Sequence, residues 1–567
     1  MNFRFGIITD THIRPKKGDQ SSPYKVNDFA NKRAEYAVNL LSSFKQKFTI
    51  HLGDVVHPLP SLPTYSVACL EAKKILKPLL SKMYFVPGNH DIGDKSHDAS
   101  PAGPLNKKTI SIYNQNFGPS WHSFVYKQIV LISINSSLVN SGLEEEKIQK
   151  VWLEKQLFKF KSKRIFLFSH YPPFIDNPNE PEHYDNYAKP GRKWLLNICE
   201  KANVEAIFSG HVHHFFYNRY KGIKMYVLPA TSFVRQDYAE IFPIEPAPEF
   251  GRNDIGKFSV SLVEITKKNH RLIFLPTEGK ITKFKKNKNF SNLKNNKCRL
   301  TPHMRHNWAG SLDLPYNGPM EEFSRKRARN DYPLMRLWQM GIQTVRTPIS
   351  DLSNKNFLKR MHDWNAVGIK FSLFKQGALN KKDLFILNKN KSLISSFDIA
   401  LKNPEKFVDK FKLKFSFPVS IGKIVSSSSS KTNSSKFAHS VSYGFELNDI
   451  NKVNFYWKNS PKLGYVFQTN DKDNLDIFFK KLSILKKLTH RPITLVIRFA
   501  GINPAIPSFD NNKLIKRLSK AIKLQKKYPF IDLQVDTFMT IDRGYHPRAG
   551  LIDRLSNLTS IGKSLIL

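Results

Sequence analysis

Eight side chains that can bind metal ions or move protons follow short apolar stretches in the first half of the sequence. They are Asp10, His12, Asp54, Asn89, His90, His170, His211 and His213. A mixture of carboxylate, amide and imidazole groups suits Mn, Fe or Zn better than Ca or an all-oxygen Mg site. A single histidine at the end of a strand is more often a turn or core residue. Eight such side chains, each following an apolar stretch, indicate a shared metal site.

The apolar stretches that position these side chains are expected to be β-strands, at 3–8, 48–52, 83–86, 164–168 and 206–208. Apolar residues recur at helical spacing in 27–44, 70–80, 144–158 and 193–202. Further strands are expected at 123–126, 130–134, 225–229, 258–265 and 271–275, and a long loop at 93–117. Strands that alternate with helices predict a layered α/β domain, in which polar groups gather at the carboxyl ends of the strands.

The order of these residues resembles that of a known family. The chain contains Asp10-Thr11-His12, Gly53-Asp54, Gly88-Asn89-His90-Asp91, His170 and Gly210-His211-Val212-His213. These segments are similar to the five ordered sequence blocks of the calcineurin-like metallophosphoesterases. The resemblance covers roughly the first half of the chain, as expected for one domain. It implies an αββα sandwich for that half.

The resemblance also implies a binuclear centre of two divalent cations. Asp10, His12 and His213 would hold one cation. Asn89, His170 and His211 would hold the other, and Asp54 would bridge the two. Such a pair can stabilise both the attacking and the leaving oxygen of an in-line displacement, with a bridging hydroxide as nucleophile. His90 would face the scissile phosphate and give a proton to the leaving group; the alternative is that it only supports its neighbours.

Two departures from the family pattern indicate which branch of the family the sequence resembles. In the Ser/Thr protein phosphatase branch the second block continues with an Asp and an Arg-Gly pair, whereas here Asp54 is followed by Val55-Val56-His57-Pro58. The carboxylate that would orient the catalytic imidazole is missing, which disfavours protein phosphatase activity and leaves His90 without an identified partner. Purple acid phosphatases lack the first-block histidine, whereas His12 is present. What remains resembles the cyclic-nucleotide and small-molecule phosphodiesterase branch.

The sequence indicates the side chains that would bind substrate less clearly than the metal ligands. The loop 172–187 follows His170 and is long enough to cover the site, so His183 and Tyr184 are candidates for substrate contacts. A polar surface loop is the alternative. Arg235, after the last block, is a candidate for a phosphate contact. Asp91 is expected to cap the following helix or to orient a neighbour.

The second half of the chain carries no comparable motif. We assign 1–280 to the metallophosphoesterase domain, 281–300 to a Lys/Asn-rich linker and 301–567 to a C-terminal α/β domain. Strand-like segments at 343–348, 369–374, 417–425, 464–468, 493–500 and 531–538 are interspersed with helical patterns, which favours a (β/α) barrel or a variant of one. Arg346, Arg498 and Asp536 fall near strand ends, where a barrel would form a ligand site; the alternative is that they cap a structural domain.

Composition limits the classes of function. The 567-residue chain has a formal net charge of +44, mostly from lysines spread along its length, so a nucleic-acid partner is disfavoured but left open. Its three cysteines show no CxxC spacing, as expected for reduced thiols. No stretch approaches the about 18 apolar residues of a membrane span, and the N-terminal segment is already a strand. We expect a cytoplasmic location and no membrane partner; the sequence gives no indication of the oligomeric state.

These observations predict a metal-dependent phosphoesterase. Its substrate would be a phosphodiester or a small phosphate ester, and its cofactors two divalent ions, with Mn, Fe or Zn favoured. One alternative is a nuclease of the same superfamily, which the positive charge keeps open. The other is a ligand-binding or regulatory protein in which the second domain recognises a ligand and the metal site is secondary.

Overall fold

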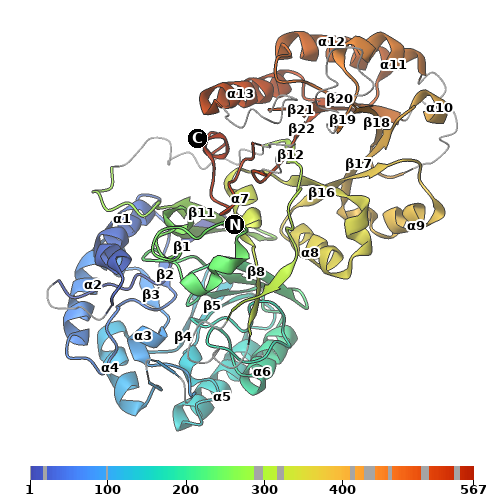
Figure 1. Cartoon of the computed structure of the whole chain (residues 1–567). Coiled ribbons are helices and arrows are strands. Elements are labelled where there is room, and N and C mark those ends of the chain that lie inside the picture. The colour runs from blue at the N-terminus through green and yellow to red at the C-terminus, as the bar shows by residue number, and fades with distance from the viewer. Residues whose placement is uncertain are drawn as a thin grey trace. The chain divides into compact units, whose positions relative to one another are not determined.

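The chain forms two compact units in a computed structural model (Figure 1). The structure describes residues 2–16, 22–97, 100–101, 103–285, 298–315, 325–408, 415–426, 441–456, 463–499, 510–541 and 549–566. The N-terminal unit comprises Met1–Asn292 and Ser311–Met335, and the barrel unit comprises Leu293–Gly310 and Arg336–Leu567. Most of the expected linker at 281–300, from 286 to 297, lies outside the described residues.

The described residues of the N-terminal unit form two large β-sheets. One has the strand order β11 (His270–Pro276), β10 (Ser259–Ile265), β1 (Phe3–Ile8), β2 (Thr49–His51) and β3 (Met83–Phe85). The other has the order β4 (His122–Tyr126), β5 (Ile129–Ser133), β6 (Arg164–Phe168), β7 (Ala206–Ser209), β9 (Ile223–Val227) and β8 (Phe216–Tyr220). Within the first sheet β1, β2 and β3 are parallel, and within the second β5, β6, β7 and β9 are parallel. Each sheet therefore has several strands that end at the same edge.

Aromatic side chains fill the space between the two sheets. The ring of Phe5 on β1 stacks on Phe48 at 5.1 Å and meets Phe168 on β6 edge-on at 6.1 Å. Such offset and edge-to-face pairs are favourable geometries for aromatic rings and bury large apolar areas. The two sheets consequently face each other through a common core.

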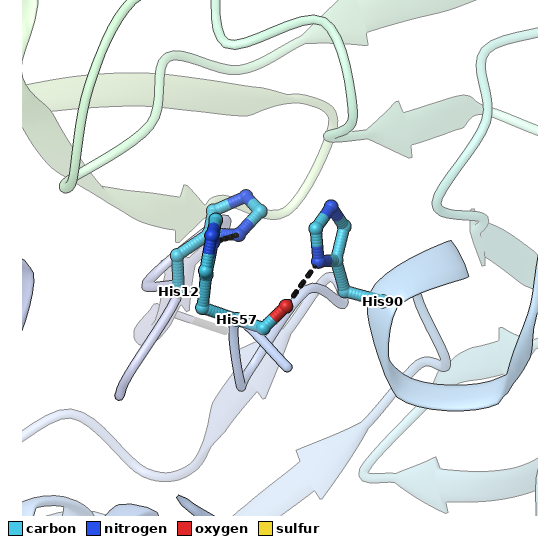
Figure 2. Close-up of side chains that lie close together, drawn as sticks. All are labelled: His12, His57 and His90. Carbon is cyan, nitrogen blue, oxygen red and sulfur yellow. Dashed lines mark hydrogen bonds between the residues drawn. The ribbon is translucent and has the colours of Figure 1, made fainter. Parts of the chain in front are cut away.

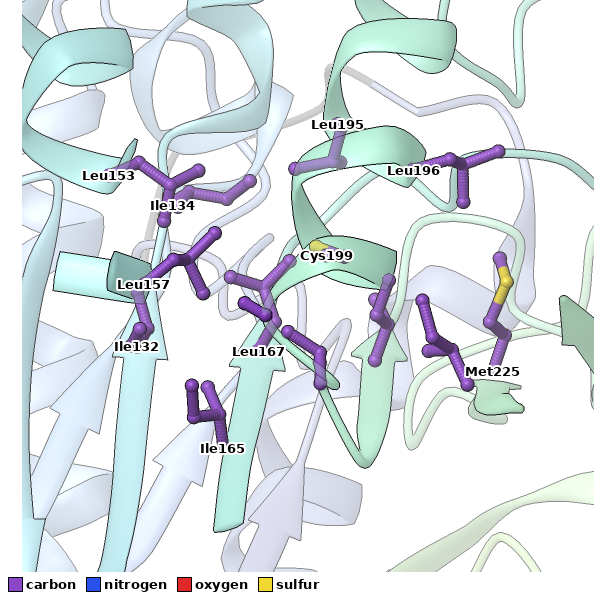
Figure 3. Close-up of a cluster of buried hydrophobic side chains, with 14 of the residues drawn as sticks. Ile132, Ile134, Leu153, Leu157, Ile165, Leu167, Leu195, Leu196, Cys199 and Met225 are labelled. Atoms are coloured by element: carbon purple, nitrogen blue, oxygen red, sulfur yellow. The ribbon is translucent and has the colours of Figure 1, made fainter. Parts of the chain in front are cut away.

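Helices cover the outer faces of the sheets. They are α1 (Ala30–Ser42), α2 (Tyr65–Leu80), α3 (Asn89–Ile92), α4 (Lys107–Phe117), α5 (Glu144–Lys159) and α6 (Lys189–Lys201). Figure 3 shows Leu153 and Leu157 of α5 and Leu195 of α6 in one buried cluster with Leu167 of the second sheet. These side chains are buried, and each contributes about 1.5–3 kcal/mol through burial. The layered αββα arrangement predicted from the sequence is confirmed.

One local expectation for this unit was wrong, and one strand was missed. The segment expected to be a loop contains α4, because the side chain of Asn106 accepts a hydrogen bond from the Thr109 amide and caps the helix, while Ile110 and Tyr113 supply a buried face. Strand β8 was not expected; it pairs with β9 in an antiparallel hairpin that turns at Gly222. Its polar residues mask the alternation that usually indicates a strand.

The assignment of 301–567 to one domain also needs correction, because Ser311–Met335 packs with the N-terminal unit. Strands β13 (Ser311–Asp313) and β14 (Arg327–Arg329) form a small hairpin in this segment. Arg329 donates to the backbone oxygen of Tyr217 and to the side chain of Asn218, both on β8. Asp331 accepts a hydrogen bond from the Tyr217 amide. These long-range bonds between buried polar groups hold the segment on the second sheet.

The barrel unit is a parallel sheet whose two edges meet. Eight strands follow one another in chain order: β12 (Leu300–Pro302), β15 (Thr344–Pro348), β16 (Lys370–Gln376), β17 (Ile394–Leu401), β18 (Val419–Ser426), β20 (Leu463–Gln468), β21 (Ile493–Ile497) and β22 (Ile531–Val535). β12 pairs with β22, and parallel bridges join Cys298 to Ile342 and His303 to Arg346. The edge strands β12 and β15 therefore meet, as in a (β/α) barrel.

Helices alternate with these strands (Figure 1). They are α7 (Tyr332–Gln339), α8 (Lys355–Asn365), α9 (Lys381–Lys389), α10 (Glu405–Val408), α11 (Ile450–Tyr456), α12 (Leu475–Thr489), α13 (Asn511–Lys527) and α14 (Ser560–Lys563), and the short strand β19 (Val441–Tyr443) pairs with β18. The predicted barrel-like α/β domain is confirmed. No helix in the described ranges combines the length and apolar character needed to cross a membrane.

Candidate metal centre

The expected ligands gather at the carboxyl ends of strands from both sheets of the N-terminal unit. Asp10 follows β1, Asp54 follows β2, Asn89 begins α3 after a short loop from β3, His170 follows β6, and His211 and His213 follow β7. All of these side chains are buried. The two sheets therefore bring residues from separate parts of the sequence to one place.

Five of these residues have an uncommon backbone conformation. Positive φ angles occur at Asp10 (50°), His12 (44°), Asp54 (50°), His211 (66°) and His213 (59°). For residues other than glycine this left-handed region costs on the order of 1–3 kcal/mol each, and such strain clusters at functional sites. The surrounding fold therefore imposes this geometry on the donor residues.

Among the described residues, His12, His57 and His90 form one group of donor atoms that are close enough to hold a cation, and two further, overlapping groups contain the expected ligands. The first of these two groups consists of Asp10, His12, Asp54 and His213, whose donor atoms lie within 4.8 Å of one another. In it, Nε2 of His213 lies 3.2 Å from Oδ1 of Asp10 and 3.1 Å from Nε2 of His12. Four buried oxygen and nitrogen donors at such distances fit a transition-metal site.

The second group consists of Asp54, His170 and His211. The amide oxygen of Asn89 lies between the two imidazoles, 3.1 Å from Nε2 of His170 and 3.0 Å from Nδ1 of His211. Asn89 thus adds a neutral oxygen donor to this group.

Asp54 belongs to both groups because its two carboxylate oxygens face different imidazoles. Oδ2 lies 3.4 Å from Nε2 of His12, and Oδ1 lies 3.3 Å from Nε2 of His170. Oδ1 also accepts a hydrogen bond from the His90 amide. A carboxylate placed in this way can share its oxygens between two cations.

Backbone carbonyls orient two of the imidazoles. Nδ1 of His213 donates to the carbonyl oxygen of Phe233 at 2.9 Å, and Nδ1 of His170 donates to that of Leu52 at 2.8 Å. Because a carbonyl oxygen can only accept, the proton lies on Nδ1 and the lone pair on Nε2 points to the donor cluster. This is the usual arrangement of imidazoles that bind metals.

Electrostatics also favour a cation at this position. Burial, reinforced by His90, lowers the pKa of His12 well below its ordinary value, and burial together with His170 lowers that of His211. These two imidazoles are therefore neutral, the form that binds metals. Burial alone would lower the pKa of His170, but the Asp54 carboxylate raises it to about 9. A cation that binds there displaces a proton.

Glycines let the backbone approach the centre closely. Gly53 has a φ of 101°, and a Cβ atom there would lie 2.5 Å from the Gly88 nitrogen. A Cβ at Gly88 would lie 2.1 Å from the nitrogen and 2.2 Å from Oδ1 of Asp54. Neither position has room for a side chain.

His90 lies beside the donor cluster on α3, and Figure 2 shows it with His12 and His57. Its Nδ1 lies 2.5 Å from the backbone oxygen of His57. The side chain of His57 points to the cluster, with Nδ1 3.3 Å from Nδ1 of His12. Asp91, next in sequence, accepts hydrogen bonds from the amides of Gly88 and Val55 and ties the loops together, as expected for an orienting residue.

The three candidate substrate residues have different surroundings. Tyr184 is half-buried beside the second donor group, where its hydroxyl accepts a hydrogen bond from the Asn89 amide. His183 is buried and uses both ring nitrogens inside its own loop, with Glu180 and the Asp185 amide. Arg235 is paired with Asp185 and Asp237. Of the three, only Tyr184 has a polar contact with an expected ligand.

Sequence reasoning missed a buried charge network next to this centre. Nζ of Lys326 lies 2.7 Å from Asp185 and 2.5 Å from Asp237, and Arg235 pairs with the same two carboxylates. Asp185 in turn lies 3.5 Å from Nε2 of His211. Carboxylates placed behind metal-binding imidazoles orient them. No local pattern in the sequence indicates that Lys326, which is distant along the chain, completes this network.

Comparisons with known proteins agree with this geometry. Residues 3–215 match the family model described as calcineurin-like phosphoesterase, so this part of the N-terminal unit is similar to that family. A serine/threonine-protein phosphatase CPPED1 from Danio rerio is 29% identical over 212 residues, which cover 35% of this chain and 64% of that protein. A probable glycerophosphodiester phosphodiesterase GpdQ from Arcobacter nitrofigilis is 31% identical over 188 residues, which cover 31% of this chain and 63% of that protein.

A purple acid phosphatase from yellow lupin is similar at the level of structure, with 15% identity and a TM-score of 0.35, covering 49% of this chain and 52% of that one. The chain spans less than two thirds of the length of the two relatives named above. The shared part is the domain that carries the donor cluster, since the family match begins in β1 and ends just after His213.

Proposed function

We propose that the N-terminal unit is a metal-dependent phosphoesterase that hydrolyses a phosphodiester or a small phosphate ester. Asp10, His12 and His213 hold one divalent cation in this proposal. Asn89, His170 and His211 hold a second, and Asp54 contacts both. The mixed oxygen and nitrogen donors favour Mn, Fe or Zn.

The position of Asp54 carries the proposal. Its two carboxylate oxygens lie 3.4 and 3.3 Å from imidazole nitrogens of different donor groups. A structural site for one cation would need only one of these groups. A shared carboxylate between two donor sets suits a pair of cations, and paired cations are typical of phosphoryl-transfer centres.

The chemistry divides between the cations and the protein. When bound, the two cations supply charge that stabilises the phosphoryl oxygens and a water activated at neutral pH. The chain holds the donors rigidly, because burial and backbone hydrogen bonds fix the imidazoles of His170 and His213. Such preorganisation means that the site does not need to rearrange during the reaction.

His90 has the role of general acid in this proposal. Its Nδ1 proton is held by the His57 carbonyl, so Nε2 is the atom that gains and loses a proton. As the bond between phosphorus and the leaving oxygen breaks, Nε2 donates its proton to that oxygen. The alcohol then leaves as a neutral molecule.

The substrate class rests on similarity to relatives. The name of the GpdQ relative gives it a glycerophosphodiester substrate, and a phosphodiester is our first candidate. The CPPED1 relative is named a serine/threonine-protein phosphatase, which makes phosphoserine or phosphothreonine in proteins the second candidate, although the second sequence block departs from that of the Ser/Thr protein phosphatase branch. A nuclease is the third, because the net charge of +44 would attract a polyanion.

The first experiment measures hydrolysis of bis(p-nitrophenyl) phosphate by the full chain with Mn²⁺, Fe²⁺ or Zn²⁺, together with the bound metal content. We expect activity with at least one metal and about two ions per chain. Asp54→Asn keeps the shape of the side chain and is expected to reduce both the activity and the number of bound ions. Asp28→Asn is the matched control, since Asp28 is an exposed carboxylate paired with Arg14. No turnover with any metal, or full activity in Asp54→Asn, would contradict the proposal.

The second experiment separates the substrate classes. The full chain is given a glycerophosphodiester, a phosphothreonine peptide and duplex DNA under the same conditions. A phosphodiesterase hydrolyses the first with the highest kcat/KM. A nuclease cleaves DNA with a steep dependence on salt, because phosphate binding releases counterions. Preference for the phosphopeptide would instead assign the function in the name of the CPPED1 relative.

A further inference from the structure

A polar cavity lies at the carboxyl ends of the strands of the barrel unit. Its volume is about 70 Å³, several times the ~15 Å³ that one water molecule needs. The residues that line it include His303, Arg346, Gln468, Arg498, Gln534 and Asp536. They come from the end of β12, from β15 and from the ends of β20, β21 and β22. This end of a parallel barrel is where ligands bind.

The lining carries more positive than negative groups. Arg346 is 7% exposed, lies 3.5 Å from Asp398 and stacks over the ring of Phe374 at 4.0 Å. Arg305 also lines the cavity and pairs with Asp536 at 3.0 Å. The guanidinium of Arg498 makes no hydrogen bond or ion pair with any residue in the described ranges. Three arginines therefore face two carboxylates, Asp398 and Asp536.

The same cavity has hydrogen-bond acceptors without donors. Oε1 of Gln468 and Oε1 of Gln534 are buried and have no partner within the described part of the chain. The orientation of each amide is set by its nitrogen. Nε2 of Gln468 donates to Ser442 at 3.0 Å, and Nε2 of Gln534 donates to Asp398 at 2.9 Å. A buried acceptor without a donor costs about 1–3 kcal/mol, so these two oxygens favour a ligand that brings hydroxyl groups.

We propose that the mouth of the barrel binds a small phosphate ester that carries hydroxyl groups. The phosphate pairs with Arg346 and Arg498, because the guanidinium group matches phosphate with two parallel hydrogen bonds. The hydroxyl groups donate to the amide oxygens of Gln468 and Gln534. Arg498 directly follows β21 and Gln534 lies on β22, the last two strands of the barrel, where phosphate groups often bind in this fold. This site is independent of the proposed phosphoesterase centre.

The test is titration calorimetry of the full chain with glycerol 3-phosphate. The titration is run on the protein as isolated and after dialysis against a chelator. Binding at the barrel survives chelation, whereas binding at the N-terminal metal centre does not. We expect one molecule bound per chain in the chelated protein, and no heat with glycerol, which lacks the phosphate. Absence of binding after chelation overturns the proposal, as does tighter binding of malate, a hydroxy acid without phosphate.

Variants separate the two parts of the site. Arg498→Gln and Arg346→Lys are each expected to weaken glycerol 3-phosphate binding at least tenfold. The matched control Lys516→Gln, an exposed lysine on α13, is expected to leave it unchanged. Arg498→Gln removes no ion pair of the described chain, so its melting temperature is expected to equal that of the wild type. Unchanged affinity in both arginine variants overturns the proposal.

The proposed contact between Gln468 and a ligand hydroxyl group has its own test. Gln468→Leu is expected to weaken binding of glycerol 3-phosphate at least fivefold while inorganic phosphate, which has no alcohol groups, binds as it does to the wild type. An equal loss for both ligands would show that Gln468 supports the phosphate pocket only and would overturn the hydroxyl contact.

Discussion

Nδ1 of His90 lies 2.5 Å from the backbone carbonyl oxygen of His57, and this contact replaces the carboxylate that the sequence lacks (Figure 2). A carboxylate beside an imidazole fixes its tautomer and stabilises its charged form. A backbone carbonyl fixes the tautomer equally well, because it can only accept. It carries a partial charge, so it stabilises the charged form less. His90 is therefore oriented without a residue that sequence comparison could identify.

Replacing His90 tests its role as general acid. We expect His90→Asn to lower kcat for an alkyl phosphodiester by 10²–10⁴-fold, the usual contribution of general acid–base catalysis. The loss is expected to be smaller for bis(p-nitrophenyl) phosphate, because p-nitrophenolate leaves without a proton. Metal content, measured on the same samples, is expected to stay near the wild-type value. Equal losses for both substrates would contradict the assignment.

His57→Ala tests whether the backbone, and not the ring, orients His90. The acceptor is a main-chain oxygen and survives this substitution, so kcat is expected to fall by less than about tenfold, far less than in His90→Asn. The pH profile of kcat/KM is expected to keep its shape. A loss as large as that of His90→Asn would mean that the His57 ring itself takes part, through its contact with His12.

Gly88→Ala tests the close approach of two loops at the metal centre. Its Cβ would lie 2.1 Å from the Asp54 nitrogen and 2.2 Å from Oδ1, so one loop must move. We expect loss of bound metal and of activity, measured by elemental analysis and by turnover. Gly118→Ala is the control: its φ of 89° is strained for alanine, but no atom lies within 4 Å of the new Cβ. It is expected to cost about 1 kcal/mol of stability and no metal. A Gly88→Ala protein with full metal content would contradict the geometry.

The residues that the sequence indicates as candidate ligands lie close together in the structure, and their signal in the sequence is local. Each expected ligand follows an apolar stretch, and parallel strands bring such positions to one edge. The barrel was predicted for a similar reason, although β17 and the short β12 were missed. The sequence of β17, Ile394–Leu401, contains polar residues that interrupt the apolar run, and β12 has only three residues. Both strands are specified by their neighbours in the barrel more than by their own composition.

What could not be predicted depends on contacts between distant residues. The carbonyl of His57 has no side-chain signature, and Lys326 lies 141 positions from Asp185. Ion pairs across such separations leave no periodic pattern in a single sequence. A truncated chain that ends near Lys283 would therefore lack Lys326 and Arg329, which are part of the N-terminal unit. Experiments on that unit need the full chain.

Lys326→Gln tests the buried network that this distant segment completes. Burial alone would raise the pKa of Asp185, but Arg235 and Lys326 hold it well below its usual range. Without Lys326, the two buried carboxylates share one guanidinium group. We therefore expect the free energy of unfolding of the N-terminal unit to fall by about 3–5 kcal/mol. The measurement is chemical denaturation. The control Lys280→Gln, an exposed lysine near Glu278, is expected to cost less than about 1 kcal/mol.

A double substitution checks the cause of that loss. Asp237→Asn in the Lys326→Gln background restores the balance of one carboxylate to one cation. We expect it to recover at least half of the lost stability, because the remaining pair is Arg235 with Asp185. If the losses of stability caused by Lys326→Gln and by Asp237→Asn simply add in the double variant, charge balance does not hold the network and the prediction fails.

Glu180 gives the loop 172–187 a stability that depends on pH. Its carboxylate accepts hydrogen bonds from the amides of Ile175 and Asp176 and from the side chain of Asn186. Burial would raise its pKa, but bonds from His183, Asn186 and the backbone lower it from 4.5 to about 2. A lowered pKa stabilises the folded loop above the unfolded value of 4.5, and this contribution, about 3 kcal/mol, is lost as pH falls toward 2.

Hydrogen exchange of the Ile175 and Asp176 amides measures this contribution, by comparing Glu180→Gln with the wild type at each pH. At pH 7 we expect the substitution to reduce protection about hundredfold, and at pH 3.5 by a clearly smaller factor, because protonation has by then removed part of the wild-type advantage. Glu182→Gln is the control in the same loop; it removes one partly exposed ion pair with Lys95 and is expected to change protection less than about fivefold. A protection ratio that stays the same at both pH values would show that the carboxylate charge does not hold the loop, and Tyr184 would then owe its place beside Asn89 to packing alone.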